Sequence, residues 1–193
     1  AYAYRAFHAI RSMNSPDGSP TNAIFGFIKM LLKMELWVRP SHRLVIWDGG
    51  LAAERMAALP DYKANRPPPP EDLVPQFPLT REATRAFNVA CLETEGYEAD
   101  DIIAALSCRA VEAGGSCTII SSDKDLMQLI RPGVDMFDPM KSRAIGPDEV
   151  MEKFGVGPDR VIDVQSLAGD SVDNVPGAPG IGLKTAALLI NEY

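Results

Sequence analysis

The stretch CTIISSDKD, residues 117–125, decides the fold class of this chain. Its first half is a short apolar run that is typical of a buried strand, and Asp123 and Asp125 follow directly after it. Residues 43–48, RLVIWD, repeat this arrangement and end on Asp48. A third strand is predicted at residues 89–93, with helices between the strands. This alternation favours an α/β fold with a mainly parallel sheet covered by helices on both faces, where ligands bind beyond the carboxyl ends of the strands.

The other elements are predicted from apolar spacing and from residues that begin or end helices. Helices are expected at residues 22–36, 52–59, 80–88, 98–113, 147–154 and 158–168, and another after a glycine-rich turn. Because proline breaks regular structure, residues 60–72, which include four consecutive prolines, are expected to form an exposed and mobile segment. We expect residues 1–145 to form the catalytic α/β domain and residues 146–193 a helical C-terminal region.

The composition excludes several classes of protein. A chain of 193 residues with 46% hydrophobic and 23% charged residues is typical of a globular domain, and it has no apolar run long enough for a membrane span, so we expect a cytoplasmic protein. Its three cysteines form no C-x-x-C pair, which favours reduced thiols over a zinc site or disulfides. The net charge of −7 argues against a nucleic-acid partner at first sight. When eight clustered acids are left out, however, 26 − 8 = 18 acidic residues remain against 19 basic ones. The rest of the chain is therefore about neutral and can carry local basic patches.

These eight acids recur in four short clusters at the predicted ends of strands or helices. Any one cluster could merely cap a helix, because aspartate accepts hydrogen bonds from the free N–H groups of a first turn. Four clusters in equivalent positions instead favour a single cleft, which like charges can share only when cations neutralise them. Hard oxygen ligands select Mg²⁺ or Mn²⁺, so we predict two such ions. The predicted ligands, also the candidate catalytic residues, are Asp48, Glu98, Asp100, Asp101, Asp123, Asp125, Asp170 and Asp173.

A pair of divalent ions predicts the hydrolysis of phosphodiesters. Two ions about 4 Å apart stabilise the attacking and leaving oxygens and generate the nucleophile from water. His8 and His42 are the only histidines, and no Ser-His-Asp arrangement is present, so no side-chain nucleophile is predicted.

Two segments are predicted to contact nucleic acid. In the proline-bounded segment, Lys63 and Arg66 either grip the scissile phosphate or belong to a merely solvated loop. Residues 175–186, VPGAPGIGLKTA, are typical of a helix-hairpin-helix element, which presents backbone N–H groups to a DNA phosphate. The further candidate DNA-binding residues are Arg5, Arg55 for a phosphate contact, Tyr4 and Tyr62 for base stacking, and Gly177, Gly180, Gly182, Lys184 and Thr185 in the hairpin.

Seven motifs in this order resemble the 5′-3′ exonuclease domain of bacterial DNA polymerase I, within the flap endonuclease family. They are YRAFHA, VIWDGG, DYKANRPPPPEDL, EGYEADDII, SSDKDLMQL, GDSVDNVPG and PGIGLKTA. The resemblance covers nearly the whole chain and implies a PIN-like three-layer fold, with a helical arch and a C-terminal helix-hairpin-helix.

The same resemblance implies roles for individual residues. The acids from Asp48 to Asp101 would serve chiefly a first metal ion, and those from Asp123 to Asp173 chiefly a second. Lys63, as an electrophilic helper, and Arg66 would belong to the arch through which a single-stranded 5′ end passes. The hairpin would hold K⁺ or Na⁺, and a DNA polymerase would be fused to the domain.

The chain departs from the family pattern at both ends. The family begins with an apolar strand ending in Asp-Gly-Ser, whereas this sequence starts at Ala1, and it stops at Tyr193 within the last predicted helix. We interpret the sequence as a truncated chain, and we expect a lower activity because the missing aspartate is linked to the metal site.

The sequence therefore predicts a monomeric, metal-dependent nuclease that acts on 5′ flaps and on nicked or gapped DNA duplexes. Two alternatives stay open. One is a non-catalytic module that binds branched DNA, and the other is a PIN-like ribonuclease.

Overall fold

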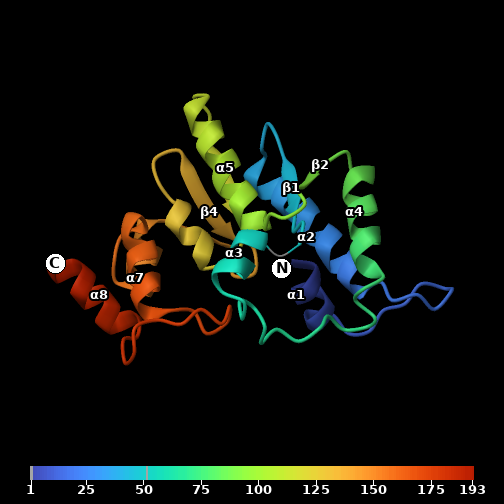
Figure 1. The fold of residues 1–193 in the computed structure, drawn as a ribbon. Coiled ribbons are helices and arrows are strands. Elements are labelled where there is room, and N and C mark those ends of the chain that lie inside the picture. Colours follow the sequence, from blue (N-terminus) through green and yellow to red (C-terminus); the bar gives the residue numbers. More distant parts are fainter. Residues whose placement is uncertain (1, 51) are drawn as a thin grey trace. The chain divides into compact units, whose positions relative to one another are not determined.

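The computed structural model describes residues 2–50 and 52–193 (Figure 1). The chain folds as two compact units, each made from two separate stretches of sequence. The first unit comprises residues 2–47 and Pro67–Glu93, and the second comprises residues 48–50, 52–66 and Thr94–Tyr193. No helix in the described part of the chain is both long enough and apolar enough to cross a membrane.

The first unit packs three helices with a pair of parallel strands. Its elements are α1 (Tyr2–Ala9), α2 (Asn22–Val38), β1 (Leu44–Trp47), α4 (Gln76–Ala86) and β2 (Ala90–Glu93). Strand β1 pairs with β2 in parallel, with Val45 opposite Cys91. Helix α2 packs against α1 and α4. The fully buried Gln76 joins α4 to α2, because its Oε1 accepts the backbone N–H of Ala23 at 2.8 Å and so satisfies a free donor of the first helical turn.

The second unit contains a three-stranded sheet and most of the helices. Strand β3 pairs in parallel with β4, and β4 pairs antiparallel with β5. In chain order its elements are α3 (Ala53–Ala58), α5 (Ala99–Glu112), β3 (Cys117–Ile120), the 3₁₀ helix η1 (Asp125–Leu129), β4 (Val134–Asp138), β5 (Arg143–Ile145), α6 (Pro147–Phe154), the 3₁₀ helix η2 (Pro158–Arg160), α7 (Val161–Ala168) and α8 (Leu183–Glu192).

One apolar core lies under this sheet and the C-terminal helices. It includes Ile119 and Met136 from the strands, Phe154 from α6, Val164 from α7 and Ala187 from α8. Residues on both sides of position 146 therefore share this core. The boundary expected between residues 145 and 146 does not separate two cores.

The predicted helices and strands are present, with ends shifted by a few residues. Strands β4 and β5 were not predicted, because β4 has only five residues, two of them acidic, and β5 has three residues. In the described residues the strands form two sheets, of two and three strands, rather than one continuous sheet. The parallel pairing of β1 with β2 and of β3 with β4 agrees with the prediction, whereas β5 is antiparallel.

The first part of the proline-bounded segment is held in place rather than mobile. The backbone N–H of Lys63 donates to the carbonyl oxygen of Asp173 at 2.9 Å, and Asn65 Nδ2 donates to the carbonyl oxygen of Ser171 at 2.9 Å. Asn174 Nδ2 donates to the carbonyl oxygen of Asp61 at 2.7 Å. Residues 61–65 form turns, so Lys63 and Arg66 do not lie on the helix that a helical arch would require.

Candidate functional site

The start of α5 places several predicted acids close together in the second unit. Glu98 precedes the helix, and its backbone N–H donates to Asp101 Oδ2 at 3.2 Å. Asp48 Oδ1 accepts the N–H of Ala99 at 2.9 Å. These bonds satisfy donors at the start of the helix, where negative charge is also favoured by the helix dipole. The carboxylates of Asp48 and Asp101 therefore cap the start of α5.

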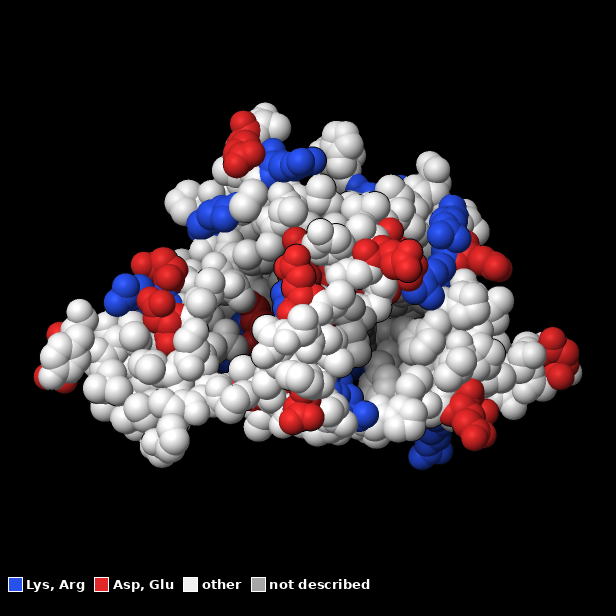
Figure 2. All heavy atoms as spheres, viewed as in Figure 1, with Lys and Arg blue, Asp and Glu red and all other residues white. Residues whose placement is uncertain are grey.

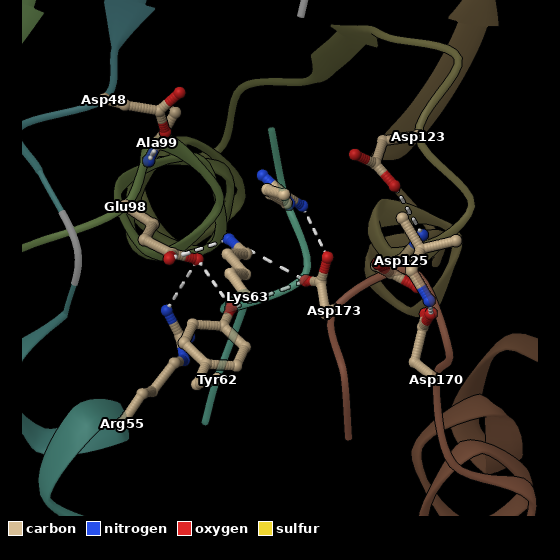
Figure 3. Close-up of polar contacts among 12 residues, drawn as sticks. Asp48, Arg55, Tyr62, Lys63, Glu98, Ala99, Asp123, Asp125, Asp170 and Asp173 are labelled. Atoms are coloured by element: carbon tan, nitrogen blue, oxygen red, sulfur yellow. Dashed lines mark hydrogen bonds and ion pairs between the residues drawn. The ribbon is translucent and has the colours of Figure 1, made fainter. Parts of the chain in front are cut away.

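Glu98 is the centre of a buried polar cluster (Figure 3). Lys63 Nζ lies 2.7 Å from Glu98 Oε1, and Arg55 Nη1 lies 3.1 Å from Glu98 Oε2. The hydroxyl of Tyr62 donates to Glu98 Oε2 at 3.0 Å. Arg55 also holds Asp101, with its Nη2 at 2.6 Å from Asp101 Oδ1. Since Glu98 is only 6% exposed, three donors converge on a carboxylate that has lost nearly all its water.

Asp173 extends this cluster toward the C-terminal region. Its carboxylate pairs with Arg66, and Lys63 Nζ lies 3.7 Å from Asp173 Oδ2. Burial lowers the pKa of Lys63, but hydrogen bonding to Glu98 and Tyr62 and the charge of Asp173 outweigh burial and raise the pKa overall. Lys63 is therefore a cation held by two carboxylates.

A second group of acids lies around the start of η1 and the turn after α7. Asp123 Oδ1 accepts the N–H of Asp125 at 3.2 Å, and Asp125 Oδ1 accepts a hydrogen bond from Gln165 Nε2 at 2.6 Å. Asp170 pairs with Lys124. Asp125 begins the 3₁₀ helix η1, and its carboxylate and that of Asp123 take different partners.

Asp100 is affected by negative charge from both groups of acids, the one at the start of α5 and the one around η1. Burial, together with the negative charges of Asp123 and Asp48, raises the pKa of Asp100 to about 7. Within residues 2–50 and 52–193, Asp48, Asp100 and Asp123 have no ion-pair partner within 4.0 Å. The charges of Asp48 and Asp123 therefore act on Asp100 at close range, and the more distant charge of Lys63 offsets them only in part.

A cavity of about 210 Å³, here called the acidic cavity, collects part of the predicted set. Its lining includes five of the eight predicted acids, namely Glu98, Asp100, Asp101, Asp125 and Asp173. Asp48, Asp123 and Asp170 are not part of the lining, and Figure 3 shows Asp48 and Asp170 on opposite sides of the group. No three His, Cys, Asp or Glu side chains among the described residues converge closely enough to hold a metal ion. The prediction that all eight acids meet in one pocket is therefore only partly met.

The acids do not all meet in one pocket because several of them have protein cations as partners. Glu98, Asp101, Asp170 and Asp173 are drawn toward Arg55, Lys63, Arg66 and Lys124, while the other acids repel one another. Eight acids and four cations leave a net charge of 8 − 4 = 4 negative units, which two divalent cations would balance. The donor chemistry and the charge thus fit two hard divalent ions, whereas the present spacing of the carboxylates does not.

The predicted helix-hairpin-helix is formed by α7, residues 169–182 and α8 (Figure 1). Gly177 packs so tightly that a Cβ would lie 2.3 Å from the carbonyl carbon of Ala168, so this glycine is required by packing. Gly180, at φ +77°, and Gly182 face open space, so another molecule can approach the backbone there. Residues 175–183 contain no charged side chain, and the surface over this hairpin is uncharged in Figure 2. Lys184 and Thr185, in the first turn of α8, are exposed.

The structure corrects one of the two tyrosines predicted to stack on bases. Tyr62 is 8% exposed and its hydroxyl is bound to Glu98, so its ring is not open to a base. Tyr4 and Arg5 are exposed on α1 in the first unit. Gln165 and Lys124 were not singled out from the sequence, although Lys124 stands between two predicted acids in SSDKD. No local signal in the sequence identifies Gln165, because its contact with Asp125 spans 40 residues.

Comparison with known proteins gives one consistent family. Residues 1–155 match the family described as 5′-3′ exonuclease, N-terminal resolvase-like domain, and residues 156–193 match 5′-3′ exonuclease, C-terminal SAM fold. DNA polymerase I of Rhizobium leguminosarum is 52% identical over 200 residues, covering 100% of this chain and 20% of the polymerase. A 5′-3′ exonuclease of Aquifex aeolicus is 38% identical over 193 residues, covering 100% of this chain and 67% of that protein.

The fold also matches solved structures. A flap endonuclease of bacteriophage T5, crystallised as a complex with DNA and metal ions, superimposes with a TM-score of 0.76 and 23% identity, over 88% of this chain and 66% of that one. This chain spans about a fifth of the length of the polymerase relative and two thirds of the exonuclease relative.

Proposed function

Because the chain belongs to the 5′-3′ exonuclease family, we propose that it is a metal-dependent nuclease that hydrolyses DNA near junctions of single and double strands. Its substrates on this proposal are 5′ flaps and nicked or gapped duplexes. The observation that carries the proposal is the acidic cavity, in which five of the eight predicted acids lie together with Arg55. Carboxylates and a guanidinium in one cavity are the groups that a phosphodiester and divalent cations require.

The acids would hold two divalent cations, Mg²⁺ or Mn²⁺. Bound there, the cations would supply Lewis-acid stabilisation of phosphate oxygens and a deprotonated water at neutral pH. Among the acids that line the cavity, Asp100 and Asp125 have the weakest competition from protein cations, since Asp100 has no ion pair and Lys124 Nζ is 4.0 Å from Asp125 Oδ1. Gln165 would orient Asp125 through its 2.6 Å hydrogen bond. Asp48 and Asp123 would complete the set from its two sides.

The cations of the cluster would bind the phosphate. Arg55, Lys63 and Arg66 now pair with Glu98, Asp101 and Asp173, and each can exchange a carboxylate oxygen for a phosphate oxygen. Lys63 is suited to stabilise the charge that develops in the transition state, because its raised pKa keeps it protonated at neutral pH. Each carboxylate released by this exchange becomes free to ligate a divalent cation. Binding of substrate and of metal would therefore support each other.

The hairpin between α7 and α8 would bind the duplex away from the cut. Its open glycines and the first turn of α8 present backbone N–H groups, which contact phosphates without reading sequence. A K⁺ or Na⁺ ion at the hairpin, a fused DNA polymerase and a monomeric state belong to the same proposal. Sequence-independent binding of this kind weakens steeply as salt rises.

A 5′-labelled flap duplex tests the nuclease directly. It is incubated with the chain in Mg²⁺, in EDTA, and with the variant Asp123→Asn. Asp135→Asn is the matched control, because Asp135 is an exposed acid on β4 outside the cluster. Nuclease activity predicts products with Mg²⁺ for the wild-type chain and for Asp135→Asn, and none in EDTA or with Asp123→Asn. Cutting that persists in EDTA would refute the metal-dependent mechanism.

A second candidate function is a module that binds branched DNA without cutting it. The observation that favours it is the absence, among the described residues, of three acids at a common ligating distance. This candidate predicts that the flap is retained in a gel-shift assay and stays intact in Mg²⁺ and Mn²⁺. An all-RNA strand in the same assay tests the ribonuclease alternative, which predicts faster cutting of RNA than of DNA.

A further inference from the structure

A second cavity adjoins the acidic cavity in the second unit. It has a volume of about 280 Å³, near the lower end for small-molecule sites. Arg55 and Asp101 line both cavities, so this ion pair forms the wall between them. On the far side of the wall, the lining includes Ala52, Ala53 and Tyr97. The acidic cavity thus collects five carboxylates, whereas the second cavity combines methyl groups and an aromatic ring with the carboxylates of Asp101 and Glu54.

The turn that carries Tyr97 is held by backbone hydrogen bonds. The carbonyl oxygen of Tyr97 accepts the N–H of Gly49 at 3.1 Å, and the N–H of Tyr97 donates to the carbonyl oxygen of Thr94 at 3.2 Å. Gly49 packs so closely that a Cβ there would lie 1.8 Å from the carbonyl oxygen of Thr94. The ring of Tyr97 therefore projects from a fixed backbone. Because less freedom is lost on binding, a contact made from such a backbone has a smaller entropic cost.

Tyr97 is an unusually exposed aromatic residue for a position beside a cavity. It is 55% exposed, in contrast to Tyr62, which is 8% exposed on the acidic side of the same region. An exposed ring beside two alanine methyl groups and a guanidinium offers flat and apolar contacts with little hydrogen-bonding selectivity. These are the properties of a site for a nucleobase of any sequence.

We propose that Tyr97 is a base-stacking residue, and that the second cavity takes the unpaired nucleobase next to the phosphate in the acidic cavity. This inference rests on the proposed function, since it places that phosphate beside Arg55. On this proposal a nucleotide lies across the Arg55–Asp101 wall, with its phosphate in the acidic cavity and its base beside Tyr97 in the second cavity. Arg55 then contacts the phosphate with its N–H groups and borders the base with its planar face.

The test is a fluorescence measurement that does not require cutting. A flap duplex carries 2-aminopurine at the first unpaired nucleotide of the junction, and a second duplex carries it at a paired position far from the junction. Both are titrated in EDTA with the wild-type chain, Tyr97→Phe and Tyr97→Leu. Tyr193→Leu is the matched control, because Tyr193 is a 92% exposed tyrosine at the end of the chain outside both cavities.

Stacking predicts that the junction probe is quenched by the wild-type chain, by Tyr97→Phe and by Tyr193→Leu, but not by Tyr97→Leu at saturation. The distant probe should not change. Tyr97→Leu should also lower the affinity for the flap by at least about fivefold, the lower limit for loss of one stacked base. Equal quenching by Tyr97→Leu and the wild-type chain would overturn the inference, as would loss of quenching in Tyr97→Phe.

The two proposals fail separately in these experiments. A chain that cuts the flap in Mg²⁺ but shows the same quenching with Leu at position 97 keeps its nuclease function and loses the stacking site. A chain that never cuts, yet quenches the junction probe only when an aromatic ring stands at position 97, keeps the stacking site and loses the nuclease function.

Discussion

The ion pair between Lys63 and Glu98 should stabilise the folded chain far more than a surface ion pair does. We expect a double-mutant cycle with Lys63→Met and Glu98→Gln to give a coupling free energy of about 2 kcal/mol, in the range for hydrogen bonds to charged groups. The two side chains are only 12% and 8% exposed, so water competes little for either charge.

The geometry around Glu98 sets this magnitude. The pair is short, at 2.7 Å, which alone would place it among strong charge-assisted hydrogen bonds. Removing one partner of an isolated buried pair costs about 3 to 5 kcal/mol, because the other charge is left unpaired. Here Glu98 keeps Arg55 and Tyr62, and Lys63 keeps Asp173 at 3.7 Å. The expected cost therefore falls below that of an isolated pair.

The measurement is urea unfolding of the wild-type chain, the two single variants and the double variant, at pH 7 in EDTA. The pair Arg160–Asp163 provides a matched control within the same unit, at 3.4 Å but with side chains 48% and 47% exposed. Solvent screening should limit its coupling to about 0.3 to 0.5 kcal/mol. If the Lys63–Glu98 coupling is no larger than that of the control, then the buried cluster does not stabilise the fold as we argue.

Four further outcomes follow from the site and the hairpin. In EDTA, the contribution of Asp100 to the free energy of unfolding should fall by up to about 4 kcal/mol as pH rises from 4 to 7. The reason is that the raised pKa of Asp100 in the folded chain favours its neutral form, so ionisation at higher pH favours unfolding. Urea unfolding of Asp100→Asn should lack this fall. Gly177→Ala should lower the free energy of unfolding by at least about 1 to 3 kcal/mol through overpacking, whereas Gly182→Ala, which meets open space, should cost less than about 1 kcal/mol and should instead weaken DNA binding. Gln165→Leu should weaken Mn²⁺ binding, measured by calorimetry, by about 10- to 100-fold, and an unchanged affinity would show that its hydrogen bond does not orient Asp125. Lys63→Ala should reduce the rate of cutting far more than the affinity for duplex DNA, and equal losses would contradict a role in transition-state stabilisation.

Much of the fold follows from patterns that are local in the sequence. The apolar runs of β1 and β3, the amphipathic spacing of α2 and the glycine turn before α8 each indicate their element within about ten residues. Strands β4 and β5 carry no such signal. Their pairing depends on the core beneath the sheet, in which Val134, Met136 and Ile145 are almost fully buried.

The site is less predictable because its contacts join distant parts of the chain. The sequence identified the acids and the cations, but not which of them pair. Lys63 meets Glu98 across 35 positions and Arg66 meets Asp173 across 107. Exposure also depends on the fold, since Tyr62, which was predicted to stack, is 8% exposed, whereas Tyr97, which the sequence did not single out, is 55% exposed.

The hydrogen bonds between residues 61–65 and residues 171–174 bear on the order in which parts of the chain fold. Loop closure over more than a hundred positions is costly before other contacts form, so these bonds are expected late in folding. On the ribosome, a growing chain that has not yet reached Asn174 lacks part of the hydrogen bonds between residues 61–65 and residues 171–174, although Glu98 is already present to bind Tyr62 and Lys63. Synthesis of residues 171–174 is thus the step that completes the contacts of the turn around Lys63.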